Sequence, residues 1–310
     1  MRRRGNNAIQ LLLLAAILAT PSLGMTQTTR STPGKTGHVM ANGVNYYYEI
    51  HGKGEPVLLL HGGLGSIDMF RDLVLPALAK GRQVIAVDLH GHGRTALGDR
   101  PINLVDIGND LSVVLKQFGF NVVDVMGYSF GGGAALRLAV QHPAQVRRLV
   151  VVSAGYAQNG FYPEMLPQQA AVSSKIFDTM KETPMYISYK AVAPKPEDFP
   201  RLLDRMGEFM RTAYDWSADV KTLQMPVMLV FGDSDMYRPE HVVSFYKLLG
   251  GGQQDAGWMR EHMSKNRLAI LPNVTHYEMF LSPALVPAVL PFLNGDNGPP
   301  SWASQVKKED

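Results

Sequence analysis

Short apolar runs that alternate with amphipathic stretches of helical length constrain the fold of this 310-residue chain more than any other feature. Such runs are typical of buried strands, and the helices between them provide the crossovers that parallel strands require. The alternation stops at Tyr156 and resumes at Met225. It predicts a mostly parallel sheet flanked by helices. We expect strands at residues 44–49, 57–60, 84–87, 122–126, 149–152, 226–231 and 267–271, and helices at 67–79, 103–118, 131–141 and 239–248.

A serine stands at the apex of one predicted strand–turn–helix unit. Residues 127–131 read Gly-Tyr-Ser-Phe-Gly, after an apolar run and before a stretch rich in Ala and Leu. A serine hydroxyl is a poor nucleophile in water, but a tight turn can expose it to a base and to backbone N–H groups. Glycine is needed beside it because a Cβ would collide with the neighbouring strand or helix. We therefore interpret Ser129 as a nucleophile, in preference to a structural glycine-rich turn.

Candidate partners of this serine follow two later strands. Asp233 and Asp235 follow the strand expected to end at residue 231, and His276 follows the next predicted strand. Open α/β sheets bind ligands at the carboxyl edge of their strands, so these side chains are expected there. A histidine can take the serine proton, and a carboxylate can orient the imidazole and stabilise its charged form. The order Ser, Asp, His predicts a catalytic triad in which either aspartate can be the acid.

Taken together, these motifs resemble those of the α/β-hydrolase superfamily over residues 37–293. The resemblance implies an α/β fold with a mostly parallel central sheet and a helical cap at 156–224. It also implies that Asp235, three residues after a glycine, is the triad acid, with Asp233 as the alternative. Thr275 departs from the family, where glycine usually precedes the histidine. The matching residues are His-Gly-Gly at 61–63, Asp-Leu-His-Gly-His-Gly-Arg at 88–94, Ser129, Gly232 with Asp235, and His276.

An oxyanion hole needs two backbone N–H donors aimed at the oxygen that becomes negatively charged. Phe130 is expected to supply one of them because it directly follows the nucleophile. The family resemblance implies Gly63 as the second donor, with Leu64 as the close alternative. A plain flexible turn is the other interpretation of this glycine-rich loop. Its position between a buried strand and a helix disfavours that interpretation.

The remaining histidines are expected to have structural roles. His90 and His92 form an H-x-H pair, but further ligands are missing, so we expect them to stabilise a turn and expect no metal site. His61 is expected to brace the oxyanion loop. His241, within a predicted helix, and His262, within a polar stretch, are both expected on the solvated surface.

Residues 156–224, the predicted cap, are rich in methionine and aromatic side chains, including Tyr189 and Met206. Most of these should pack the cap onto the core. As a set they still favour an apolar pocket, because such side chains adapt to bulky apolar ligands. No arginine cluster or glycine-rich phosphate loop appears, which disfavours phosphoester chemistry. The rest of the chain is divided into a core domain in two parts, 37–155 and 225–293, and a flexible tail, 294–310.

The N-terminus has the three parts of a secretory signal peptide at residues 1–24: basic residues 2–4, an apolar stretch at 9–19 and small residues at 22–24. We expect its cleavage, a disordered leader at 25–36, and a periplasmic or secreted protein with no stable membrane anchor. The absence of cysteine excludes a lipoprotein anchor and disulfides. The three basic residues account for the whole formal net charge of +3, so the chain without residues 1–24 has a formal net charge of zero. Its charge therefore gives no indication of a nucleic-acid partner.

The function predicted from these features is a serine hydrolase that cleaves a carboxylic ester or lactone through an acyl-enzyme. The expected substrate is a bulky apolar small molecule, and no cofactor is required. A C–C bond hydrolase or an amidase or aminopeptidase with the same triad is the alternative. Dehalogenases and epoxide hydrolases of this fold carry Asp where Ser129 stands, which argues against both. A non-catalytic binding protein is disfavoured because all three triad residues are present. The oligomeric state stays open.

Overall fold

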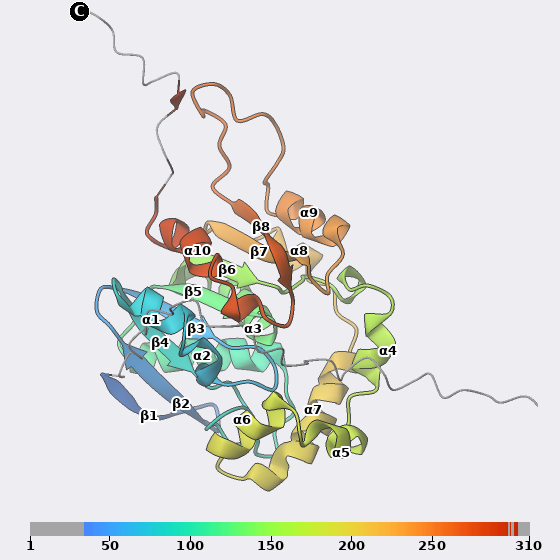
Figure 1. Cartoon of the computed structure of the whole chain (residues 1–310). Coiled ribbons are helices and arrows are strands. Elements are labelled where there is room, and N and C mark those ends of the chain that lie inside the picture. Colours follow the sequence, from blue (N-terminus) through green and yellow to red (C-terminus); the bar gives the residue numbers. More distant parts are fainter. Residues whose placement is uncertain (1–33, 297, 299–300, 303–310) are drawn as a thin grey trace, which may run out of the picture.

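The computed structural model describes residues 34–296, 298, 301 and 302. The strands are β1 (Lys35–Ala41), β2 (Val44–His51), β3 (Glu55–Leu60), β4 (Arg82–Val87), β5 (Val123–Tyr128), β6 (Val146–Val152), β7 (Val227–Ser234) and β8 (Arg267–Thr275). They form one sheet in the order β1-β2-β4-β3-β5-β6-β7-β8 (Figure 1). The pairs β1–β2 and β2–β4 are antiparallel, and the other neighbours are parallel. The predicted fold class is confirmed.

Helices cover both faces of this sheet (Figure 1). The core helices are α1 (Val74–Ala79), α2 (Leu104–Gln117), α3 (Phe130–Gln141), α9 (Pro239–Leu248) and α10 (Leu285–Leu293). Side chains of α2, α3 and α9 form the apolar core on one face, and those of α1 and α10 form the core on the other. Because the central strands are apolar along most of their length, both of their faces can be buried in this way.

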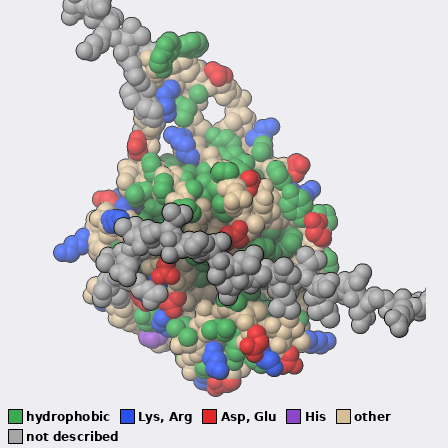
Figure 2. All heavy atoms as spheres, viewed as in Figure 1, with side chains coloured by type: hydrophobic (Ala, Val, Ile, Leu, Met, Phe, Trp, Pro, Cys, Tyr) green, Lys and Arg blue, Asp and Glu red, His purple; other side chains and the backbone are tan. Residues whose placement is uncertain are grey.

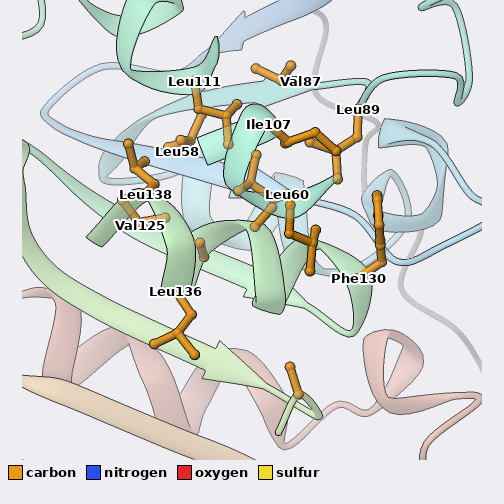
Figure 3. Packing of buried hydrophobic residues seen from close by; sticks show 14 of the residues in the cluster. Leu58, Leu60, Val87, Leu89, Ile107, Leu111, Val125, Phe130, Leu136 and Leu138 are labelled. Atoms are coloured by element: carbon orange, nitrogen blue, oxygen red, sulfur yellow. The ribbon is translucent and has the colours of Figure 1, made fainter. Parts of the chain in front are cut away.

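The larger of the two cores joins strands and helices that are distant in sequence. Leu58 and Leu60 of β3 lie with Ile107 and Leu111 of α2, and all four are fully buried (Figure 3). Burial of each such side chain stabilises the fold by about 1.5–3 kcal/mol. Asn103 begins α2 by accepting hydrogen bonds from backbone N–H groups of its first turn. This core holds the carboxyl ends of the central strands in a fixed arrangement.

Helices that connect β6 to β7 form a separate layer beside the sheet (Figure 1). They are α4 (Met165–Ala170), α5 (Phe177–Met180), α6 (Pro184–Val192) and α7 (Phe199–Arg211). The short helix α8 (Ser217–Val220) follows them and lies against the sheet domain, where its Asp219 pairs with Arg137 of α3. In this layer the rings of Tyr186 and Tyr189 lie 5.0 and 5.1 Å from that of Phe199, and this aromatic group is continuous with the larger core of the sheet domain. An ion pair between Arg201 of α7 and Asp99 ties the layer to the sheet domain at 2.9 Å. The layer corresponds in position to the predicted cap.

β1 and α10 were not predicted, and one predicted helix is divided into two parts. β1 begins at Lys35, two residues inside the expected leader, where Lys35 pairs with Ile50 of β2. Its outer residues face solvent at the sheet edge, so the apolar pattern that marks a buried strand is weak. The single helix expected at 67–79 is a 3-10 turn (Ile67–Phe70) followed by the short helix α1. Asp88 accepts a hydrogen bond from the Ile67 N–H, which binds this turn to the loop after β4.

The predicted signal peptide, and the predicted leader up to residue 33, lie outside the described residues. Within the described part of the chain, no helix has the length and apolar content needed to cross a membrane. Trp302 of the tail contacts Trp258, with ring centroids 5.8 Å apart. On the face seen in Figure 2, Lys and Arg side chains are interspersed with Asp and Glu, so charges of one sign do not gather into an extended area there.

Candidate active site

Ser129 lies on the turn between β5 and α3 in a strained backbone conformation. Its φ of 53° and ψ of −118° are rare for a residue with a Cβ. The turn is also crowded. A Cβ on Gly127 would collide with the Gly131 carbonyl, and a Cβ on Gly131 would collide with the Leu60 carbonyl. Glycine at both positions therefore lets the chain reverse sharply and hold the serine side chain at the end of the strand.

The structure brings Ser129, His276 and Asp235 together in one hydrogen-bonded chain. Ser129 Oγ lies 2.9 Å from His276 Nε2, and His276 Nδ1 lies 3.0 Å from Asp235 Oδ1. The three residues come from the turn after β5 and from the loops after β7 and β8, at the carboxyl edge of the sheet. His276 is 6% exposed and Asp235 is 7% exposed. The chain is thus largely shielded from water.

The Asp235 carboxylate is held by several donors besides the imidazole. Oδ1 accepts the Met236 backbone N–H at 2.8 Å, and Oδ2 accepts the Ser153 hydroxyl at 2.5 Å and the Gly232 N–H at 3.3 Å. Burial acts to raise the pKa of Asp235, but hydrogen bonds from His276 and Ser153 and the attraction of His276 lower it below its ordinary value. The carboxylate is therefore ionised at neutral pH and able to stabilise an imidazolium.

Asp233 has a different role in the structure. It is exposed, and its carboxylate accepts the backbone N–H groups of Asn273 at 2.9 Å and Val274 at 3.3 Å. The hydrogen bond from Asn273 lowers the pKa of Asp233. Asp233 therefore ties the end of β7 to the end of β8, while Asp235 is the aspartate that contacts His276.

Two contacts at the triad were missed by the sequence reasoning. Tyr128 donates its hydroxyl to the backbone carbonyl of His276 at 2.5 Å, and its ring lies 5.5 Å from the imidazole. Ser153 donates to Asp235 from the end of β6. The signal available in the sequence was the place of both residues at the carboxyl ends of central strands. Thr275 stands where the family usually has glycine. Its N–H donates to the Glu278 carboxylate at 2.9 Å.

The two residues expected to form the oxyanion hole lie next to each other. A Cβ built on Gly63 would be 3.6 Å from the Phe130 Cβ. Phe130 is the first residue of α3, so its N–H belongs to the helix N-terminus, where backbone donors have no partner within the helix. Leu64, the alternative donor, has a φ of 56°. The loop after β3 and the start of α3 thus converge beside Ser129.

Histidines beside this loop have the structural contacts that were expected. His61 is fully buried, faces the Gly62 carbonyl through Nδ1 at 2.7 Å and accepts the Leu89 N–H through Nε2 at 3.0 Å. Burial lowers the pKa of His61, so it is neutral in the fold. His92 stacks on Phe130 at 5.3 Å, and burial lowers the pKa of His92 to about 3.

The expectation that His241 lies on the solvated surface is wrong. Its side chain is 5% exposed and stacks on Tyr156 with ring centroids 4.2 Å apart. Burial lowers the pKa of His241 to about 4. The reason is that α9 turns this residue toward the core, where aromatic rings can cover it. His262, in contrast, is exposed in the loop before β8.

Helix α7 of the capping layer covers the oxyanion loop. Met206 is 1% exposed, and its Cε would lie 3.1 Å from a Cβ on Gly63. The ring of Phe209 meets that of Phe130 edge to face at 5.3 Å. Apolar side chains of α7 therefore pack against Gly63 and Phe130, the two residues expected to supply the oxyanion N–H groups.

The family comparison agrees with this architecture. A sequence profile described as alpha/beta hydrolase fold matches residues 55–184. A 2-hydroxymuconate semialdehyde hydrolase from Pseudomonas sp. (strain CF600) is 39% identical over 124 residues, which are 38% of this chain and 43% of that protein. A putative carbamate hydrolase, RutD, from Azorhizobium caulinodans is 36% identical over 115 residues, which are 37% of this chain and 43% of that protein. The chain thus matches less than half the length of these curated relatives.

Solved structures extend the likeness over most of the chain. The enol-lactonase from Burkholderia xenovorans LB400 superposes with a TM-score of 0.62 at 16% identity, covering 83% of this chain and 100% of that one. Likeness at this level of identity concerns the fold alone. The sheet order, the profile match over residues 55–184 and this superposition show that the chain has the α/β-hydrolase fold. The relatives named above are hydrolases.

Proposed function

We propose that this protein is a serine hydrolase that cleaves a carboxylic ester or lactone. The observation that carries the proposal is the hydrogen-bonded chain from Ser129 through His276 to Asp235, with distances of 2.9 and 3.0 Å. A nucleophile, a base and an orienting carboxylate in this arrangement are what acyl transfer requires. The strained turn that presents Ser129 supports the same proposal.

The reaction begins when Ser129 Oγ attacks the carbonyl carbon and His276 Nε2 takes the hydroxyl proton. Asp235 orients the imidazole and stabilises the imidazolium that forms. The N–H groups of Phe130 and Gly63 donate to the oxyanion. Collapse of the tetrahedral intermediate breaks the ester C–O bond, and the alcohol leaves with the proton from His276. Water then gives its proton to His276 and attacks the acyl-enzyme, which releases the acid and restores Ser129.

The apolar side chains of α7 beside the site are the evidence for a bulky apolar substrate. Met206 and Phe209 lie beside Gly63 and Phe130, so substrate groups attached to the carbonyl would contact thioether and aromatic surface. Each methylene buried there contributes about 0.8 kcal/mol of binding energy. A lactone differs from an open ester only in that the alcohol stays attached to the acyl group after cleavage.

A C–C bond hydrolase is the second candidate. It is favoured by the 39% identity over 124 residues to a 2-hydroxymuconate semialdehyde hydrolase. The same triad can serve both reactions, so fold and site residues do not separate them. The chain is also 36% identical over 115 residues to a putative carbamate hydrolase. Amide and carbamate substrates should therefore be tested beside esters.

A matched substrate panel tests the proposed reaction. Purified protein is given an ester, an amide, a carbamate and a vinylogous diketone that carry the same apolar substituent, and products are identified by mass. We expect the ester to have the highest kcat/KM and expect Ser129→Ala to abolish its turnover. A diketone preference would transfer the assignment to C–C bond hydrolysis. Ester turnover by the Ser129→Ala variant would refute the serine mechanism.

Export to the periplasm or medium is also proposed, from the sequence of residues 1–24 alone. The substrate would then be a small apolar ester or lactone met outside the cytoplasm, with no cofactor or nucleic-acid partner.

A further inference from the structure

Ser153 follows β6 directly and contacts the acid of the triad from the side opposite the imidazole. Its side chain is fully buried, and its hydroxyl donates to Asp235 Oδ2 at 2.5 Å. The other carboxylate oxygen, Oδ1, faces His276 Nδ1 at 3.0 Å. Oδ2 has a second donor in the Gly232 N–H, but at 3.3 Å. The shorter bond from Ser153 therefore restricts rotation of the carboxylate and so sets the direction of the bond to the imidazole.

Backbone hydrogen bonds fix Ser153 relative to both neighbouring strands. The Ser129 N–H donates to the carbonyl of Val152 at 2.8 Å, and the Ser153 N–H donates to the carbonyl of Val230 at 2.8 Å. Ser153 thus stands between the strand that presents the nucleophile and the strand that leads to Asp235. Hydrogen bonds thus link Ser129 to His276, His276 to Asp235, and Asp235 to Ser153. The backbone bond from Ser129 to Val152, the residue before Ser153, completes the circuit.

The backbone of Ser153 is itself unusual, with a φ of 49°. Residues with a Cβ rarely adopt this conformation, whereas glycine adopts it freely. The Cβ of Ser153 does not stabilise this backbone conformation. What its side chain adds is the hydroxyl that meets the carboxylate. Backbone outliers of this kind are found where a site requires a particular geometry.

We propose that Ser153 is a positioning residue, which holds the Asp235 carboxylate so that it can orient His276 during catalysis. This inference rests on the proposed function, because it concerns the same triad. Ser153 acts through Asp235 and does not contact the substrate. Hydrogen bonds to charged groups are among the stronger ones in proteins, so its removal should slow the chemical step by about tenfold to hundredfold.

The test compares Ser153→Ala and Ser153→Gly with a matched control, Ser112→Ala. Ser112 is a buried serine of α2 whose hydroxyl has no hydrogen-bond partner among the described residues, so the control removes an equally buried hydroxyl away from the site. The rate constant for labelling of Ser129 by a fluorophosphonate and the kcat and KM for an apolar ester are measured for each protein. Thermal unfolding is followed to show that each variant is folded.

Both Ser153 variants are expected to lose about tenfold to hundredfold in labelling rate and in kcat, with KM changed less than about twofold and Ser112→Ala unchanged. In an Asp235→Asn background, Ser153→Ala should cost no more than about twofold, because the two residues act as a unit. If the alanine variant fails to fold, the glycine variant carries the test, since glycine accepts the φ of this position.

Labelling of Ser153→Gly at the wild-type rate would overturn the positioning role. So would an equal loss from Ser153→Ala with and without Asp235. A wild-type protein that is not labelled at Ser129 would be a different result, because it would remove the proposed function and this inference with it.

Discussion

Replacing Asp235 with asparagine is expected to lower kcat about 10⁴-fold while leaving the fold intact. In the proposed reaction an ionised Asp235 faces a positively charged His276, and 3.0 Å separate Oδ1 from Nδ1. Two unit charges at that separation attract each other by about 5 kcal/mol at an effective dielectric constant of about 20. Loss of this attraction raises the barrier by a similar amount, and about 1.4 kcal/mol corresponds to tenfold in rate.

The donors around the carboxylate determine how the asparagine would be oriented. Oδ1 accepts the Met236 N–H at 2.8 Å, a group that can only donate. Oδ2 accepts the Ser153 hydroxyl, which can also accept a hydrogen bond, and it accepts the Gly232 N–H only at a longer 3.3 Å. The Met236 N–H is thus the nearer of the two groups that can only donate. The asparagine should therefore keep its carbonyl toward His276 and turn its NH₂ toward Ser153. The loss then comes from the missing charge, since the imidazole retains an acceptor at Nδ1.

Steady-state kinetics on one apolar ester, with Asp233→Asn as the matched control, measures this effect. Asp233 is exposed and accepts two backbone N–H groups, so its substitution should cost less than about tenfold. Circular dichroism and thermal unfolding verify that both variants are folded. Turnover of Asp235→Asn within tenfold of wild type would refute the reasoning. A larger loss from Asp233→Asn would show that the acid is the other aspartate.

Three further predictions concern the cap, a buried histidine and the N-terminus. Met206→Ala should change the ratio of kcat/KM between short and long esters. Tyr189→Ala removes a ring packed in the cap, so it should lower the unfolding temperature and leave that ratio unchanged. Wild-type stability should fall as the pH decreases from about 6.5 toward 4, because the unfolded chain binds a proton that buried His241, with its pKa lowered to about 4, does not bind in the fold. For His241→Phe, the unfolding temperature should decrease less between about pH 6.5 and 4. An unchanged dependence of unfolding temperature on pH would show that His241 is not the source of the pH effect. Protein recovered from a bacterial periplasm should begin near Met25 on N-terminal sequencing, and intact Met1 would argue against cleavage.

The parts of the fold that could be predicted are those whose signal is local. An apolar run of four to six residues identifies a central strand. Helix α9 was predicted with its observed bounds, Pro239–Leu248. β1 was missed because only Val39 and Ala41 of this strand are buried, so no apolar run indicates it. The segment expected as one helix at 67–79 is a 3-10 turn followed by α1. The Asp88 carboxylate accepts the N–H of Ile67 at its start, a contact that sequence periodicity does not reveal.

The candidate site shows the same division between local and non-local signals. Ser129, Asp235 and His276 stand in short motifs at strand ends, and the structure places them within hydrogen-bonding distance of one another. Tyr128 and Ser153 carry no motif of their own. Their roles depend on which strands are neighbours and on the register between them, and both are set by the whole sheet. Burial of His241 likewise depends on the packing of α9 against the core.

Labelling of Ser129 by a fluorophosphonate, located by mass spectrometry of proteolytic peptides, tests the central claim most directly. Our account predicts one covalent adduct per chain, on the peptide that contains residue 129, with labelling lost in Ser129→Ala and slowed about 10⁴-fold in Asp235→Asn. An adduct on a different residue, or persistent labelling of the Ser129→Ala variant, would contradict the assignment of this serine as the nucleophile.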